Sequence, residues 1–327
     1  MNIRALERTL LFSAAMLWAV SASAQDAAAN YPSRPIRIVV GFVPGGATDV
    51  VARLMAQKLQ EAWSQPVVVE NKPGGGSNIG SEQVARATPD GYTLLLGTIA
   101  NATNMSIYKD LAYDTLRDFA PVTQFMSAPS VLVVAPSLAP NDLKELIALA
   151  KSKPGMLSFA SSGAGGSPHL AGELLKLRAG IDIIHVPYKG AAPALADVMT
   201  GTVSMGFKTA LSAIPQMQSG RLKPIAVAAN RRLPQIPNVP TMAEAGLGDF
   251  EVSSWNGLLA PAKTAPEIVA KLNRELVRIL ATSEVREKFA AQAAEPVGST
   301  PEQFRAYIKA EIDKWAQVVK ASGAKVD

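Results

Sequence analysis

Short runs of branched aliphatic residues alternate with segments of helical periodicity along most of the chain. This alternation is typical of βα units whose strands run parallel. Few polar positions interrupt the runs, which indicates strands that are covered on both faces. The predicted strands lie at residues 36–40, 67–70, 93–96, 131–134, 157–160, 183–186, 203–207, 225–228 and 258–260. The pattern therefore predicts an α/β fold.

The C-terminal part of the chain carries the clearest helical signals. One predicted helix follows the start signals Thr264 and Pro266, and its apolar residues recur at helical spacing. The last helix has Thr300 at the N-cap, Pro301 in the first turn and Gln303 three residues after the cap, which is a capping-box pattern. No internal repeat or low-complexity linker divides the chain. Any division into domains must therefore be part of the fold.

The first 24 residues are typical of a secretory signal peptide. Arg4 and Arg8 give a basic start, residues 10–20 are an apolar run, and small residues precede a cleavage site after Ala24. A membrane anchor is the less favoured alternative, because the run is about half of the ~20 residues that span a bilayer. We expect an exported protein. It has no lipid-accepting cysteine, so we expect a second membrane to retain it in the periplasm.

The composition restricts the chemistry that the chain can perform. Its 327 residues leave room for two domains of roughly 150 residues each. The absence of cysteine excludes disulfides, thiolate metal sites and cysteine nucleophiles. A net charge of +5 is too small to argue for nucleic acid, and the 6% of aromatic residues form no cluster with basic ones. We expect no cofactor and no nucleic-acid partner.

A glycine-rich turn joins the first predicted strand to a helix. Residues 41–49 include the adjacent Gly45 and Gly46. Such a turn lets the backbone approach a ligand closely, and the N–H groups of the first helical turn favour an anion. The alternative is a tight turn with Thr48 or Asp49 as an ordinary helix cap. A carboxylate would repel an anion, so we expect Asp49 to cap the helix or hold the loop, unless the ligand carries an ammonium group.

A second glycine cluster, at residues 161–169, again joins a strand to a helix. Ser167 is the expected N-cap, and Pro168 lies in the first turn. The two helix starts could face each other across a cleft and offer amides to both ends of a small molecule with two anionic groups. A third cluster at residues 72–80 and a strand end at 96–101 are expected to line the same rim.

No catalytic template is complete. No serine has glycine two residues before and after it, and no Gly-Lys pair gives a phosphate-binding loop. The only histidines, His169 and His185, do not have a metal-ligand spacing. We expect His185 to be a satisfied core or interface histidine, whereas His169 at a helix start could contact a ligand. The sequence therefore predicts neither a metal site nor a catalytic residue.

Several motifs occur in a fixed order along the chain. They are YPSRPIRIVV at 31–40, PGGATD at 44–49, NKPG at 71–74, DGYTLL at 90–95, HLAGE at 169–173, VPYKG at 186–190, PTMAEAG at 240–246 and WNGL at 255–258. In order and spacing these motifs resemble the periplasmic receptors of tripartite tricarboxylate transporters, the Bug family. The resemblance covers essentially the whole chain after the signal peptide.

The resemblance implies a type II periplasmic-binding-protein fold, in which two lobes close on a ligand in the cleft between them. Each lobe would be a mostly parallel sheet flanked by helices. Lobe 1 would comprise residues 25–125 and 252–327, and lobe 2 residues 126–251. The resemblance implies that the ligand is a small carboxylate, because such receptors bind di- and tricarboxylates, acidic amino acids or aromatic acids. They pass the ligand to integral-membrane transporter subunits, and we expect a monomer. Carried over by position, the ligand residues would be Phe42, Pro44, Gly45, Gly46, Ala47, Thr48, Asp49, Thr98, Asn101, Ser162, Gly163, Ala164, Ser167, His169 and Tyr188.

One departure from the family pattern bears on the ligand. Lys208 follows Phe207 at a position where the family often has an acidic residue. An acidic side chain could receive an ammonium group, whereas a lysine would favour a carboxylate. We therefore add Lys208 to the candidate ligand residues and expect an amine-free mono- or dicarboxylate. A solvent-exposed Lys208 without a ligand role is the alternative.

The expected function is a solute-binding receptor and not an enzyme. A ligand that touches both lobes would favour their closed arrangement, which offers membrane subunits a different surface. One alternative is a sensor that presents the ligand to a membrane kinase. The other is an enzyme on the same fold, although the nucleophile motif of a hydrolase and the cofactor cysteine of related transferases are both missing.

Overall fold

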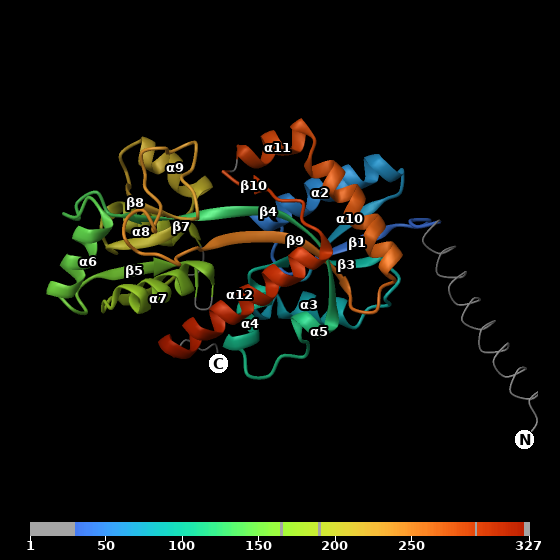
Figure 1. Cartoon of the computed structure of the whole chain (residues 1–327), viewed down its shortest axis with the longest axis horizontal. Coiled ribbons are helices and arrows are strands. Elements are labelled where there is room, and N and C mark those ends of the chain that lie inside the picture. The colour runs from blue at the N-terminus through green and yellow to red at the C-terminus, as the bar shows by residue number, and fades with distance from the viewer. Residues whose placement is uncertain (1–29, 164–165, 189–190, 292, 324–327) are drawn as a thin grey trace, which may run out of the picture.

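The computed structural model describes residues 30–163, 166–188, 191–291 and 293–323 (Figure 1). Its strands are β1 Ile36–Val40, β2 Val67–Asn71, β3 Thr93–Thr98, β4 Phe119–Val134, β5 Ser158–Ser161, β6 Ile184–Pro187, β7 Met205–Thr209, β8 Lys223–Ala228, β9 Ser253–Pro261 and β10 Glu295–Pro296. Its helices are α2 Ala47–Trp63, η1 Gly75–Ser77, α3 Asn78–Ala85, α4 Ala100–Ile107, α5 Thr115–Asp118, α6 Leu143–Ser152, α7 Ser167–Ala179, α8 Ala191–Thr200, α9 Ala210–Gln218, α10 Pro266–Leu280, α11 Ser283–Ala290 and α12 Pro301–Ser322. The predicted signal peptide lies outside the described residues.

The strands form a mixed sheet in the order β2-β1-β3-β9-β4-β7-β5-β6, and β8 and β10 also pair with β4. The pairs of β1 with β2 and β3, and of β5 with β6 and β7, are parallel. Every pair that involves β4 or β9 is antiparallel. The predicted α/β fold is therefore confirmed, and the antiparallel strands are the ones that join its two halves.

Strand β4 crosses from one half of the molecule to the other. It pairs with β9 from Phe119 to Pro129 and with β7 and β8 from Ser130 to Val134. In Figure 1, β4 and β9 run along the long axis between two groups of helices. We call the half with β1–β3 and α10–α12 lobe 1, and the half with β5–β8 and α6–α9 lobe 2. The predicted boundaries at 125/126 and 251/252 stay a prediction.

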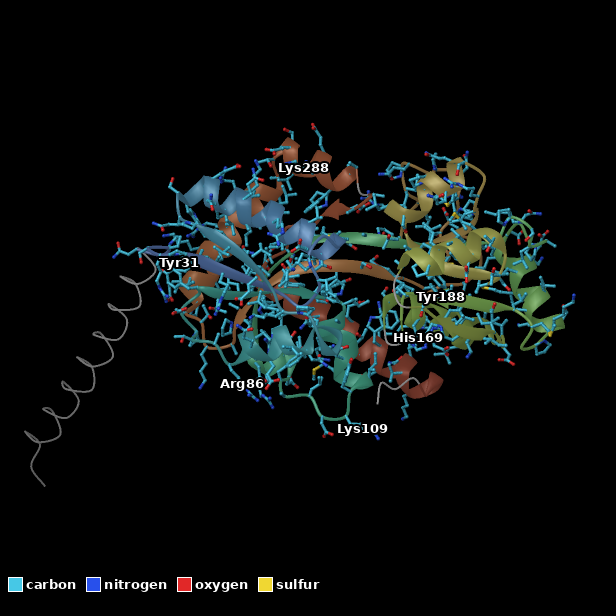
Figure 2. All side chains as sticks on the ribbon, turned by 180° about the vertical axis from the view of Figure 1, so that it is seen from behind. Tyr31, Arg86, Lys109, His169, Tyr188 and Lys288 are labelled. Atoms are coloured by element: carbon cyan, nitrogen blue, oxygen red, sulfur yellow. The ribbon has the colours of Figure 1, made fainter. Side chains whose placement is uncertain are left out.

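Lobe 1 contains both early and late segments of the chain. Figure 2 labels Tyr31 and Lys288 on lobe 1, and His169 and Tyr188 on lobe 2. Helix α12 packs against α4 and β4, and also contacts α7 of lobe 2. The chain therefore leaves lobe 1, builds lobe 2 and returns.

Helices cover both faces of the sheet, as the apolar runs predicted. In β1, Ile36, Ile38 and Val40 pack in one core cluster with residues of α2 and α10, whereas Val39 packs in another with residues of α12. Alternate residues of a strand face opposite sides, so both sides of β1 are buried. No helix within the described residues combines the length and the apolar character needed to cross a membrane.

The predicted starts of the last helices are confirmed. Helix α10 begins at Pro266. The Thr300 hydroxyl accepts a hydrogen bond from the Gln303 N–H at 3.2 Å, and the Gln303 side chain accepts one from the Thr300 N–H at 3.0 Å. These two bonds are the predicted capping box, which satisfies N–H groups that have no partner within the helix.

Candidate functional site

A cavity of about 920 Å³ lies between the two lobes. Lobe 1 lines it with the β1–α2 loop and the β3–α4 junction, and lobe 2 with the β5–α7, β7–α9 and α8 starts. The crossing strands add Met126, Ala128 and Asn256. The lining includes the predicted residues Phe42, Gly46, Ala47, Thr48, Thr98, Ser162, Gly163, Ser167 and Lys208. The fold thus brings together candidates from distant parts of the sequence.

The other predicted ligand residues do not line this cavity. Those described by the structure are Pro44, Gly45, Asn101, Asp49, His169 and Tyr188. Ala164 lies outside the described residues. Several of them support residues that do reach the cavity.

Five helices of the described chain begin at the cavity. Helices α2, α4, α7 and α8 each place their first residue in the lining, and α9 places its N-cap there. The N-cap residues of α2, α4, α7 and α9 make no side-chain cap hydrogen bond, and the first N–H of α4, at Ala100, instead donates to Thr98 Oγ1 at 3.2 Å. The first N–H groups of a helix have no partner within it and carry a partial positive charge. Helix N-termini from both lobes therefore line the cavity, and they favour an anion there.

The N-caps of α2 and α7 are glycines, which contradicts the predicted Ser167 cap of α7 and the alternative caps Thr48 and Asp49 of α2. Gly46 and Gly166 hold these positions in extended conformations, so neither Thr48, Asp49 nor Ser167 is the cap. A glycine has no side chain that could accept the first amides, which leaves them accessible to a ligand. The prediction that Ser167 is the N-cap was wrong, because Gly166 holds that position.

Ser167 is the first residue of α7, and its hydroxyl is an unusual group. The side chain is 7% exposed and lines the cavity. Its Oγ is buried and makes no hydrogen bond with any described group. Buried hydroxyls normally have a partner, since leaving one unpaired costs about 1–3 kcal/mol. The Ser167 hydroxyl therefore has unused hydrogen-bonding capacity at the wall of the cavity.

Asp49 holds the β1–α2 loop in place. Its buried carboxylate accepts hydrogen bonds at 2.9 Å from the Gly45 N–H, from Arg53 Nε and from Asn71 Nδ2. The Arg53 bond, assisted by the other two, holds the pKa of Asp49 at about 2. Asn71 also donates to the Phe42 carbonyl at 3.0 Å. Of the roles considered for Asp49, the structure shows the loop-holding one.

Asn101 positions the end of β3. Its Oδ1 accepts from the Thr98 N–H at 2.9 Å, and its Nδ2 donates to Ser81 Oγ at 3.0 Å. The Thr115 hydroxyl donates to the Asn101 carbonyl at 2.6 Å. Asn101 thus fixes Thr98, which does line the cavity.

His169 of α7 and His185 of β6 stack on each other. Their ring centroids are 3.9 Å apart, and Ser161 Oγ lies 2.6 Å from His185 Nε2. Burial lowers the pKa of both His169 and His185 to about 4, so both rings are neutral at neutral pH. His185 is the satisfied histidine that the sequence predicted. Tyr188, labelled near His169 in Figure 2, donates to Asp197 at 2.5 Å.

Lys208 is buried, so the solvent-exposed alternative was wrong. The residue is 5% exposed and lies in β7, where it pairs with Val131 of β4. Its ammonium makes no hydrogen bond or ion pair within the described part of the chain, and burial alone lowers the pKa of Lys208 to about 8. Gly206 leaves room for it, because a Cβ there would lie 3.3 Å from Lys208 Nζ.

Sequence reasoning missed several residues of the lining. Trp255 and Asn256 were noted only as part of a motif, yet both line the cavity. The Trp255 Nε1–H is buried without an acceptor among the described residues. The start of α9 at Thr209 and Ser212 was also missed, because no glycine cluster marks it. For Trp255 and Asn256, the available signal was the motif at 255–258.

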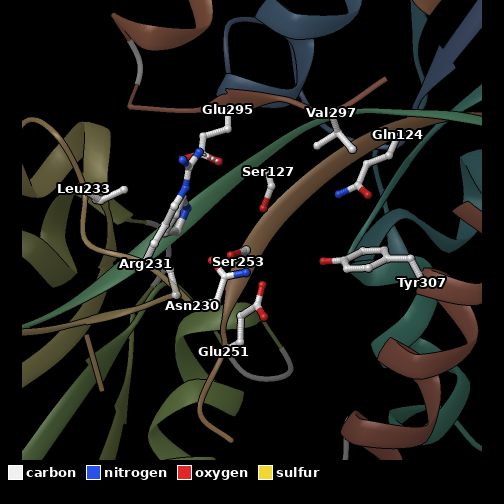
Figure 3. A pocket seen from close by; sticks show the side chains of 12 residues that line it. Gln124, Ser127, Asn230, Arg231, Leu233, Glu251, Ser253, Glu295, Val297 and Tyr307 are labelled. Carbon is white, nitrogen blue, oxygen red and sulfur yellow. Dashed lines mark ion pairs between the residues drawn. The ribbon is translucent and has the colours of Figure 1, made fainter. Parts of the chain in front are cut away.

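A second cavity, of about 200 Å³, lies on the other side of the crossing strands (Figure 3). Ser127 of β4 lines it, whereas Met126 and Ala128 line the larger cavity. Neighbouring residues of a strand face opposite sides, so the two cavities lie on opposite faces of β4. Arg231 of lobe 2 and Glu295 of lobe 1 form an ion pair of 2.7 Å at this second cavity. The pair therefore joins the lobes behind the strands that connect them.

The chain is similar to known receptors over most of its length. A family model described as the tripartite tricarboxylate transporter family receptor matches residues 51–324. Protein BugT of Bordetella pertussis is 41% identical over 306 residues, which are 93% of this chain and 94% of BugT.

Solved structures are similar in fold as well as in sequence. The R. palustris protein Rpa4515, solved with adipate, is 36% identical with a TM-score of 0.79, over 90% of this chain and 100% of that one. MatC from Rhodopseudomonas palustris, solved with bound malate, is 34% identical with a TM-score of 0.76, over 88% of this chain and 100% of that one. The predicted type II periplasmic-binding-protein fold with two lobes is confirmed.

Proposed function

The chain belongs to the tripartite tricarboxylate transporter receptor family, and we propose that it captures a small carboxylate between its lobes for integral-membrane subunits of such a transporter. The receptor works in the periplasm as a monomer, after cleavage of the signal peptide behind Ala24. It binds its ligand without changing it chemically.

The charge balance of the larger cavity is the observation that carries this proposal. Of the described residues that line it, Lys208 is the only charged one, and none is Asp or Glu. N-termini of helices with uncapped amides line the cavity on both lobes. A carboxylate would be attracted by all of these groups, and a cation by none.

Lobe closure completes the site in this proposal. A ligand that touches the α2 start in lobe 1 and the α7 start in lobe 2 stabilises the arrangement in which both contacts are made. The lobes move as units with boundaries near 125/126 and 251/252, and β4 and β9 connect them. The ligand contacts come from the lining residues that the sequence predicted, and Asp49 and Asn101 hold the loops that carry them.

Calorimetry and solution scattering test the proposal together. We expect the purified receptor to bind at least one member of a panel of aliphatic and aromatic carboxylates, and its radius of gyration to decrease on binding. Mass spectrometry of the released ligand should recover it unchanged. The proposal fails if no carboxylate binds, or if the bound carboxylate is converted to a product.

A further inference from the structure

Lys208 has no counter-ion in the cavity that it lines. The side chain is 5% exposed, and no described lining residue is acidic. Burying an unpaired ammonium is costly, and proteins normally pair such a group. A neutral residue would pack in β7 without this cost, so packing does not explain the lysine.

Lys223 shows what a lysine with a structural role looks like in the same lobe. It lies in β8, which also pairs with β4. Its ammonium donates to the Leu138 carbonyl at 2.6 Å and to Asn141 Oδ1 at 3.1 Å. Lys223 thus connects a turn to the sheet by hydrogen bonds, whereas Lys208 makes no such bond with the described residues.

We propose, on the basis of the proposed function, that Lys208 selects the class of carboxylate: its ammonium binds one carboxylate of a ligand whose second carboxylate meets the first turn of α2. The favoured ligand is a dianion without an ammonium group. An amino acid is rejected, because its ammonium would lie in a cavity whose described lining has one cation and no carboxylate. Lys208 is therefore a specificity-determining residue.

The rest of the lining fits such a ligand. The unpaired Ser167 Oγ and the uncapped α7 start lie in the same lobe as Lys208, and the uncapped α2 start lies in the other. Apolar side chains also line the cavity, among them Phe42, Ile99, Met126, Leu195, Phe207 and Trp255. These surroundings suit a hydrocarbon spacer between two carboxylates.

Matched ligand pairs test the selection by calorimetry at pH 7. Adipate and hexanoate differ by one carboxylate, and glutarate and glutamate differ by one ammonium group. We expect adipate to bind about 30-fold or more tightly than hexanoate, because removing one partner of a buried charge pair costs at least about 2 kcal/mol. We expect a similar preference for glutarate over glutamate, because the described lining has no carboxylate that could pair with the added ammonium group. In Lys208→Met the preference for adipate over hexanoate should fall below about threefold, while hexanoate affinity stays within about threefold.

Lys223→Met is the matched control and should keep the preference. Lys208→Gln is a second variant of the same position, and a melting temperature not below that of the wild type shows that either variant is folded. If no carboxylate binds, the proposed function itself fails. If carboxylates bind but the preference for adipate persists in Lys208→Met, or glutamate binds as tightly as glutarate, the receptor assignment stands and the role of Lys208 is refuted.

Discussion

Replacing Lys208 by methionine should make the empty receptor more stable at neutral pH. Methionine has nearly the same length and carries no charge, so the substitution removes the buried ammonium and keeps most of the packing. Most substitutions of buried residues have the opposite effect. The sign of the change therefore distinguishes an unpaired charge from a structural side chain.

The size of the effect follows from the pKa of Lys208. Burial lowers this pKa from 10.5 to about 8. Each pKa unit corresponds to about 1.4 kcal/mol, so the ammonium costs the folded protein about 3 kcal/mol at pH 7. Because the folded pKa lies below the unfolded one, the unfolded chain binds more protons between pH 8 and pH 10.5. The free energy of unfolding of the wild type thus gains this amount as the pH rises through that window.

Urea unfolding of both proteins at pH 7 and pH 10, without ligand, measures the effect. We expect Lys208→Met to exceed the wild type by up to about 3 kcal/mol at pH 7, and the difference to shrink by most of that amount at pH 10. Other titrating groups cancel in the difference between the two proteins. Lys223→Met should be less stable at both pH values, since it loses the bonds to Leu138 and Asn141. A Lys208→Met protein that is less stable at pH 7, or a difference that does not change with pH, would refute the reasoning.

Three further substitutions test other parts of the structure. Ser167→Ala should weaken ligand binding about 5- to 30-fold in calorimetry and raise the stability of the empty receptor by about 1–3 kcal/mol, because it removes a buried hydroxyl that has no partner. Gly257→Ala should lower the free energy of unfolding by about 1–3 kcal/mol or more in urea titration, since the new Cβ would lie 2.4 Å from Phe304 Cζ. Arg231→Gln should tighten ligand binding by up to about fivefold. It removes the ion pair with Glu295, which would be pulled apart when the lobes close on the larger cavity at the opposite face of β4. An exposed ion pair contributes up to about 1 kcal/mol, which corresponds to this factor.

Each of these substitutions has a control. The exposed Ser137→Ala should bind ligand like the wild type. Gly248→Ala should be tolerated, because no atom lies within 4 Å of the new Cβ. Glu295→Gln should reproduce the effect of Arg231→Gln, and weaker binding in either variant would contradict the position of the pair behind β4 and β9.

Local sequence signals predicted most of the secondary structure. The capping box of α12 needs only Thr300 and Gln303, which are three residues apart, and both bonds form as expected. The parallel strands were visible as apolar runs because helices cover both of their faces. The first part of β4 was not visible, since Pro121, Thr123 and Gln124 interrupt its apolar pattern. Pairing with β9 on the far side of the sequence holds that part in place.

The candidate site was predictable where glycine marks a loop and, for Lys208, where the sequence departs from the family pattern. The two glycine clusters indicated the starts of α2 and α7, and both line the cavity. The N-cap of α7 was misassigned, because Gly166 and the adjacent Ser167 are both residue types that favour this position. The burial of Lys208 depends on β4 and β7 packing together across the lobe, so the adjacent sequence carried no signal for it.

Several polar side chains of the empty cavity have no partner within the described residues. Among them are the Lys208 ammonium, Ser167 Oγ and the Trp255 Nε1–H. Each lowers the stability of the empty receptor, and a ligand that pairs with them recovers that free energy on binding. The same groups therefore weaken the empty protein and increase its affinity. Among variants with substitutions at the cavity, those with the most stable empty receptor should therefore bind ligand most weakly. This trade-off is expected where function requires unsatisfied polar groups.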